Sequence, residues 1–186
     1  MTDEESYSPR PLRGVVVTHV GEEVLGPLIS VRPDLRVPSR IHARVVFSDQ
    51  PMAFEVALEW DSAELSYLVK RLVIDADGAV STADLHKVSL PTLIRLAASG
   101  DPEVMTEEGD WERFELVLAS LDLTEFQSEI AAAGPTDDVL KWVGRIYAWG
   151  RIMGGNPNQL VVSTLGLPKR TATRWIARAR QIGHLD

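Results

Sequence analysis

The chain has 186 residues, of which 45% are hydrophobic and 25% charged, with a net charge of −8 and no cysteine. This composition is typical of a folded soluble protein. The length allows one ordinary domain, or a domain of about 130 residues followed by a small module. The absence of cysteine excludes disulfide frameworks and thiolate metal sites. No run of about 18 apolar residues predicts a membrane span, and the polar start MTDEESYSPRP lacks the apolar segment of a signal peptide. We therefore expect a cytoplasmic protein with a flexible tail over residues 1–10.

The charge is unevenly distributed along the chain. Residues 136–186 hold eight Lys or Arg and three Asp or Glu, a net charge of +5, which leaves −13 for residues 1–135. The 47 residues from Val139 to Leu185 contain no acidic side chain. A segment that faces a polyanion is the simplest physical cause of such a distribution.

Residues 11–134 predict an acidic α+β domain. Four stretches rich in β-branched or aromatic residues indicate an antiparallel sheet: GVVVTHV, RIHARVVF, FEVALEW and LSYLVKRLVID. DADG, residues 75–78, is expected to form a hairpin turn after the last of them, since it lacks the remaining ligands of a calcium loop. Helices are expected at about 81–87, 90–98, 110–120 and 123–133. Strands followed by helices predict an α+β fold.

A change of composition at AAAGPTDD marks the domain boundary. Gly134 and Pro135 end one helix, and Thr136 is expected to cap the next, whose first turn carries Asp137 and Asp138. We therefore predict a separate helix-turn-helix module over residues 135–186.

Three helices are expected in this module. The first covers about 137–152, the second begins at Pro157, and the third covers 168–182. Gly166 lies in the turn between the last two, where a positive φ is needed. The residues expected in the core of this unit are Val161, Leu165, Leu167, Ala172 and Trp175.

The outward face of the last helix is basic. Arg170, Arg174 and Arg178 lie four residues apart on one stripe, where like charges repel by about a few tenths of a kcal/mol per pair unless an anion lies against them. We predict that the partner is double-stranded DNA and that this helix lies in the major groove. The start of the second helix would then meet a phosphate, and Arg151 would contact the DNA backbone. The candidate DNA-binding residues are Asn158, Gln159, Lys169, Arg170, Thr171, Thr173, Arg174 and Arg178. Arg178 and Arg180 could instead complement the dipole at the helix end.

Residues 146–185, IYAWGRIMGGNPNQLVVSTLGLPKRTATRWIARARQIGHL, resemble the C-terminal module of helix-turn-helix proteins common in actinobacteria and their phages. The segment LSYLVKRLVIDADGAVSTADLHKVSLPTLIR looks more loosely like the part that precedes that module in such proteins. Val162 departs from the pattern, because a small alanine is usual there and lets the helices approach closely. The resemblance implies a transcriptional regulator.

No catalytic motif is recognised, so we expect no enzyme, no metal site and no cofactor. His19, His42, His86 and His184 are isolated in the sequence. The alternative function is a protein-interaction or adaptor protein, whose acidic domain binds a partner while the C-terminal helices serve as scaffold.

A lone three-helix module offers few DNA contacts, so we also expect a homodimer. It would form through the sheet of the first domain or through apolar helices around Leu93, Trp111 and Phe114. The alternative is a monomer in which these three residues belong to the core.

Overall fold

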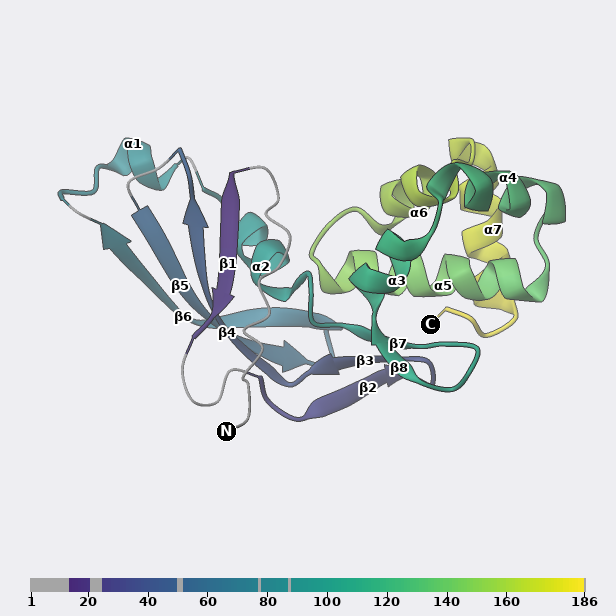
Figure 1. Ribbon diagram of the computed structural model, residues 1–186, viewed down its shortest axis with the longest axis horizontal. Helices are drawn as coiled ribbons and strands as arrows, with labels where there is room; N and C mark the ends of the chain where they lie inside the picture. The colour runs from purple at the N-terminus through teal and green to yellow at the C-terminus, as the bar shows by residue number, and fades with distance from the viewer. Residues whose placement is uncertain (1–13, 21–24, 50–51, 77, 87, 186) are drawn as a thin grey trace.

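The fold is α+β, as the sequence predicts. The computed structural model describes residues 14–20, 25–49, 52–76, 78–86 and 88–185. The expected tail over residues 1–10 lies outside these ranges. Within them the chain forms two four-stranded antiparallel sheets and seven helices, with most of the helices in the C-terminal half (Figure 1). None of these helices is long and apolar enough to cross a bilayer.

The first sheet has the strand order β1-β4-β5-β6. Its strands are β1 (Val15–His19), β4 (Arg40–Phe47), β5 (Met52–Asp61) and β6 (Ser66–Ala76). The expected alternation is present, since Phe54, Val56 and Leu58 of β5 are buried whereas Glu59 is exposed. Helix α2 (Leu90–Ala98) packs against β4 and β5, with Leu93 and Leu96 in the same core. This lobe matches the four strands read from the sequence.

The second sheet was not predicted. It contains β2 (Leu28–Arg32), β3 (Leu35–Pro38), β7 (Glu103–Met105) and β8 (Trp111–Arg113), in the order β2-β3-β7-β8. The helix expected at 110–120 therefore begins only at Phe114, as α3 (Phe114–Ser120), because residues 111–113 pair with β7. The hairpin expected at DADG is also wrong, since the chain continues after Ala76 into α1 (Thr82–Leu85) and not into another strand.

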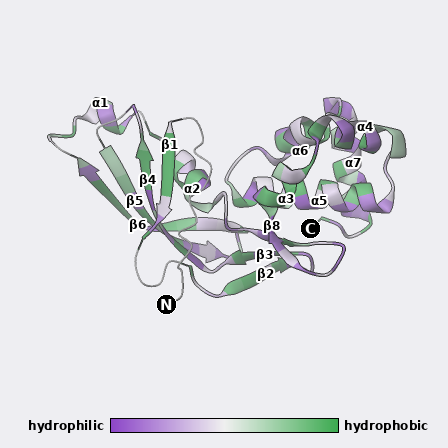
Figure 2. Cartoon of the chain, viewed as in Figure 1, coloured by the Kyte–Doolittle hydropathy of each residue, from purple (hydrophilic) through white to green (hydrophobic). Residues whose placement is uncertain are grey.

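The remaining helices form one lobe with α3. They are α4 (Leu123–Ala133), α5 (Asp137–Ile152), α6 (Pro157–Leu165) and α7 (Lys169–Gln181), close to the predicted bounds. In Figure 1 they lie on the opposite side of the molecule from the first sheet, with the second sheet beneath both. Hydrophobic and hydrophilic residues are interspersed both along α4 and α5 and along the strands of the first sheet (Figure 2).

Two hydrophobic clusters meet at α5. Its C-terminal end contributes Ile152 to the cluster of the first sheet, followed by Met153, whereas Leu140, Val143 and Ile146 belong to the cluster of the helical lobe. The helical cluster also contains Phe114, Phe126 and Ile130, which precede the expected boundary at residue 134. Helices α3 and α4 are therefore part of the packing that supports α5, α6 and α7.

Two of the three apolar residues expected at a dimer surface belong to the core. Leu93 and Phe114 are fully buried, so they cannot contact a second copy. Trp111 is half-buried and lies beneath the Arg36 guanidinium, 4.2 Å from the ring centroid. Leu93 and Phe114 therefore form no dimer surface in this packing, and the predicted dimer stays a prediction.

Candidate nucleic-acid interface

The turn between α6 and α7 requires a glycine for two reasons. Gly166 has φ 64° and ψ 21°, the left-handed conformation that glycine adopts without strain, and its amide donates to the Val162 carbonyl. A Cβ at this position would also lie 2.7 Å from the side-chain carbonyl group of Gln127. The chain leaves the turn through Pro168, and α7 begins at Lys169. The predicted role of Gly166 is confirmed.

One face of α7 is buried against the other helices. Ala172, Trp175, Ile176 and Ala179 recur at intervals of three and four residues and are all buried. The two alanines are almost completely inaccessible, so α7 approaches its neighbours closely along this stripe. The five predicted core residues of the unit, Val161, Leu165, Leu167, Ala172 and Trp175, are all buried.

The packing of this face fixes the direction of the opposite one. Lys169, Arg170, Arg174 and Arg178 are exposed. None of the four makes an ion pair or side-chain hydrogen bond with any residue that the structure describes. Their guanidinium and ammonium donors are therefore available to an external acceptor. We call this set, Lys169, Arg170, Arg174 and Arg178, the α7 basic stripe.

The threonines of α7 differ in their exposure. Thr171 is half-buried, whereas Thr173 is exposed and donates its hydroxyl proton to the Lys169 carbonyl at 2.9 Å. This bond leaves the oxygen lone pairs of Thr173 free to accept and its methyl group free for apolar contact. Thr173 is therefore accessible beside the α7 basic stripe, whereas Thr171 is only partly accessible.

The start of α6 has fewer free amide donors for a phosphate than the sequence predicts. Asn158 and Gln159 are exposed in its first turn, but the Asn156 side chain already accepts from the Gln159 amide at 3.1 Å. Pro157 has no amide proton, and Leu160 donates to the Asn156 carbonyl. Gln159 also lines a cavity shared with α2. Within the described part of the chain, the Asn158 amide is thus the donor left at this helix end.

Two further arginines of the module are already engaged. Arg151, expected on the DNA backbone, donates to the Glu64 carbonyl of the β5–β6 turn at 3.2 Å. Arg180 lies over the ring of Tyr147, 5.9 Å from its centroid, at the end of α7. Both side chains serve contacts within the protein, so neither belongs to the α7 basic stripe.

Helix α4 supports the turn, a role that the sequence did not reveal. The Gln127 side-chain amide donates to the Ser163 and Thr164 carbonyls at 3.3 and 3.1 Å. Phe126 packs edge-on against Trp142 of α5, with ring centroids 5.2 Å apart. The bonds from Gln127 satisfy two carbonyls at the end of α6, where the Gly166 and Leu167 amides both donate to the Val162 carbonyl.

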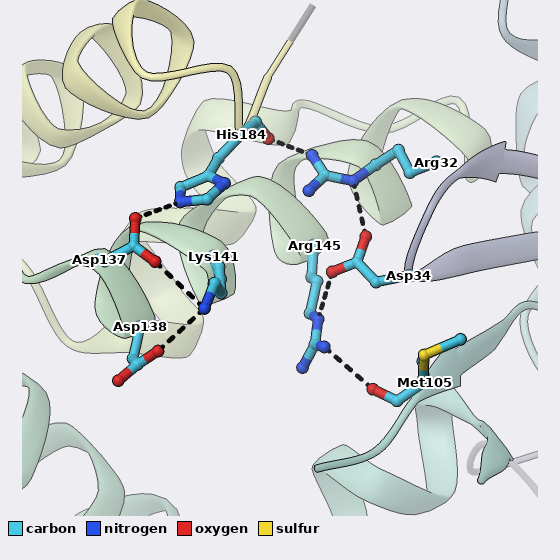
Figure 3. A network of polar contacts seen from close by, with 8 residues as sticks. All are labelled: Arg32, Asp34, Met105, Asp137, Asp138, Lys141, Arg145 and His184. Carbon is cyan, nitrogen blue, oxygen red and sulfur yellow. Dashed lines mark hydrogen bonds and ion pairs between the residues drawn. The ribbon is translucent and has the colours of Figure 1, made fainter. Parts of the chain in front are cut away.

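The segment after α7 is anchored to α5 and to β2 (Figure 3). His184 Nε2 lies 2.8 Å from Asp137 Oδ1, and Arg32 donates to the His184 carbonyl. Gly144 of α5 allows this approach, because a Cβ there would collide with that carbonyl. The hydrogen bond from His184, with a second from Lys141, holds the pKa of Asp137 below its ordinary value.

Asp34 joins the same network between two arginines. Its carboxylate accepts from Arg32 at 3.1 Å and from Arg145 at 2.8 Å, and Arg145 also donates to the Met105 carbonyl (Figure 3). Burial alone would raise the pKa of Asp34, but the hydrogen bond from Arg145 and the charge of Arg32 outweigh it, so the pKa lies below its ordinary value. The turn between β2 and β3 is thereby attached to the middle of α5.

A hydrogen bond between His19 and the buried Asp101 in the sheet lobe likewise has no signal in the sequence. His19 Nε2 lies 3.1 Å from Asp101 Oδ2. Among the residues that the structure describes, Asp101 is the one charged residue that is buried. The two residues are 82 positions apart, so no local pattern could join them. Searching the described residues for three or more His, Asp or Glu side chains able to hold a metal ion finds no such group.

Comparison of the chain with protein-family models, curated proteins and solved structures gives no match. The resemblance to actinobacterial helix-turn-helix proteins therefore stays an expectation. The geometry of α5, α6 and α7 is the observation from which a function can be argued.

Proposed function

We propose that the protein is a sequence-specific DNA-binding protein that acts as a transcriptional regulator, with α7 in the major groove. The α7 basic stripe carries this proposal: its four cations are exposed and have no acidic partner among the described residues, on a helix whose other face is buried. Cations of like sign at intervals of four residues repel one another, and a bound polyanion reverses that cost.

The chemistry of the stripe suits DNA. Arginine donates bidentately to guanine O6 and N7 or to a phosphate, and Lys169 and Arg170 lie in the first turn of α7, the part of a recognition helix that meets base edges. Thr173 adds an acceptor and a methyl group, which suit an amino group and a thymine methyl. The Asn158 amide at the start of α6 is placed to meet a phosphate.

The acidic part of the chain contributes to specificity in this proposal. Residues 1–135 carry a net charge of −13, so they are repelled by the duplex and lower the affinity for DNA of any sequence. Binding then depends on the contacts of α7. The other candidate function, an adaptor whose acidic domain binds a basic partner, requires no DNA contact.

The test is a titration of sheared genomic DNA with the full chain at about 50 mM salt, where phosphate contacts are strongest, followed by selection of bound fragments from a random pool. The full chain is needed because α4 packs on α5 and α6. We expect salt-dependent binding and a recovered sequence motif. Absence of binding at this salt concentration contradicts the proposal and favours the adaptor.

We propose further that the protein binds DNA as a homodimer formed through the first sheet. The exposed apolar residues Val16 of β1 and Leu68 and Leu72 of β6 lie on the two edge strands of this sheet. Two modules would then reach half-sites about 34 Å apart. Light scattering with and without DNA tests this: a single copy bound to an asymmetric half-site contradicts the dimer.

A further inference from the structure

A cavity separates the sheet lobe from the helix-turn-helix unit. Its volume is about 470 Å³, within the range of about 300–1,000 Å³ typical of small-molecule sites. Helix α2 forms one wall with Leu96 and Ser99, and α5 and α6 form the other with Trp149, Met153 and Leu160. Sites between two lobes of a protein are common places for ligands.

The corner between α5 and α6 forms one end of the cavity. A Cβ at Gly150 would lie 2.8 Å from Pro157 Cα and 3.2 Å from Leu160 Cδ2, so the two helices already touch at this point. Because Gly150 has no side chain, the start of α6 rests directly on α5. Leu160 and Ser163 of α6 then line the cavity together with Leu96 and Ser99.

The lining combines an apolar surface with one available charge. Arg95 of α2 lines the cavity, is exposed, and makes no ion pair or side-chain hydrogen bond with any described residue. Glu115 also lines it but already interacts with another group of the chain. Asn156, Gln159 and Ser163 add neutral polar groups on the α6 side.

We propose that this cavity binds a small organic anion with an apolar body. The body would lie between Leu96, Trp149 and Leu160, and its anionic group would accept from the Arg95 guanidinium. This site is independent of the α7 basic stripe, so its test involves no DNA and its failure leaves the proposed function untouched.

The test compares two fluorescent probes of nearly the same shape with the full chain. 8-Anilinonaphthalene-1-sulfonate carries an anionic group, and N-phenyl-1-naphthylamine is its neutral counterpart. We expect saturable binding of one sulfonate probe per chain, and an affinity at least fivefold lower in Arg95→Gln. The neutral probe should bind equally to both proteins. Arg71→Gln, which removes an exposed arginine of β6, is the matched control and should change neither affinity.

Two substitutions fill the cavity from opposite walls. Ser163→Trp from α6 and Ser99→Trp from α2 should each abolish binding of both probes, while Ser128→Trp on the exposed face of α4 should not. Circular dichroism identifies any variant that fails to fold, and the other filling variant then decides. Absence of saturable binding, or binding that survives either folded filling variant, overturns the proposal. If the sulfonate probe binds the natural chain and Arg95→Gln with equal affinity, Arg95 does not bind the anionic group and the proposal of an anion is overturned.

Discussion

Gln127 of α4 donates a hydrogen bond to the Thr164 carbonyl of α6 at 3.1 Å, two residues before the glycine of the helix-turn-helix turn. The same side chain occupies the space where a Cβ of Gly166 would lie. A helix outside the three-helix unit thus holds the turn that sets the direction of α7.

This relationship predicts the cost of a side chain at the turn. Gly166→Ala should destabilise the protein by about 1–3 kcal/mol from its positive φ, and by more because the new methyl group meets Gln127. Gly154→Ala is the matched control, since it has φ 61° with open space around it. Urea unfolding should show the larger loss for Gly166→Ala, and Gln127→Ala in the same chain should recover part of it. Equal losses at the two glycines would contradict the contact.

The α7 basic stripe predicts base-specific contacts. Arg174→Ala or Lys169→Ala should cost about 1–3 kcal/mol on the best site and relax its sequence preference, because a bidentate or direct contact to a base edge is lost. Arg95→Ala, at an exposed arginine of α2 away from both α7 and the sheet edges, should leave DNA binding unchanged. Competition binding with mutated sites measures both effects. Equal losses on every sequence would show that α7 contacts phosphates alone.

The position of Asp34 between two arginines predicts a pH-dependent stability. Its pKa in the folded protein lies below 3.8, so its stabilisation is present above that pH and is lost as the pH falls through the folded pKa. Asp34→Asn should lower the free energy of unfolding at pH 7 by about 1–3 kcal/mol, because Arg32 and Arg145 lose a charged partner.

Urea unfolding between pH 7 and pH 2 measures this dependence. The difference between the natural chain and Asp34→Asn should shrink as the pH falls below about 3.8. Asp138→Asn, at an exposed ion pair with Lys141, should change stability by less than about 1 kcal/mol. A constant difference at all pH values would mean that Asp34 stabilises the fold without its charge.

The hydrogen bond between His19 and the buried Asp101 predicts different effects of removing its two partners. His19→Ala should destabilise the protein by about 1–3 kcal/mol, because Asp101 would remain buried without a hydrogen bond. His86→Ala, at an exposed histidine, should stay within about 0.5 kcal/mol. Adding Asp101→Ala to His19→Ala should recover part of the loss. If the double variant is no more stable than His19→Ala, the unpaired Asp101 carboxylate is not the cause of the loss.

Local patterns predicted the helical lobe well. The bounds of α5 are those expected, and α7 differs by one residue at each end, because Gly134, Pro157 and Gly166 mark the helix ends and the apolar residues recur at helical spacing. Thr136 occupies the predicted cap position of α5, although its side chain makes no capping hydrogen bond. The acid-free stretch likewise located the α7 basic stripe.

The second sheet could not be predicted in this way. Strands β7 and β8 have three residues each, too few to show alternation, and β7 pairs with β3 from a distant part of the chain. The same holds for the contacts of Gln127 with Ser163, of Asp34 with Arg145 and of Asp101 with His19. These partners are between 36 and 111 residues apart in the sequence. The cavity between α2 and α6 is likewise a product of how the lobes pack.

The salt dependence of DNA binding tests the central claim most directly. Fluorescence anisotropy with the selected duplex should give a linear fall of log K with log salt concentration, with a slope of about −0.9 per phosphate contact. Replacing Arg170, Arg174 and Arg178 together by Gln should weaken binding strongly and flatten this slope, whereas Arg95→Gln, at an exposed arginine of α2, should leave the slope unchanged. A triple variant that binds with the same affinity and slope as the natural chain would contradict the assignment of α7 as the DNA-binding helix.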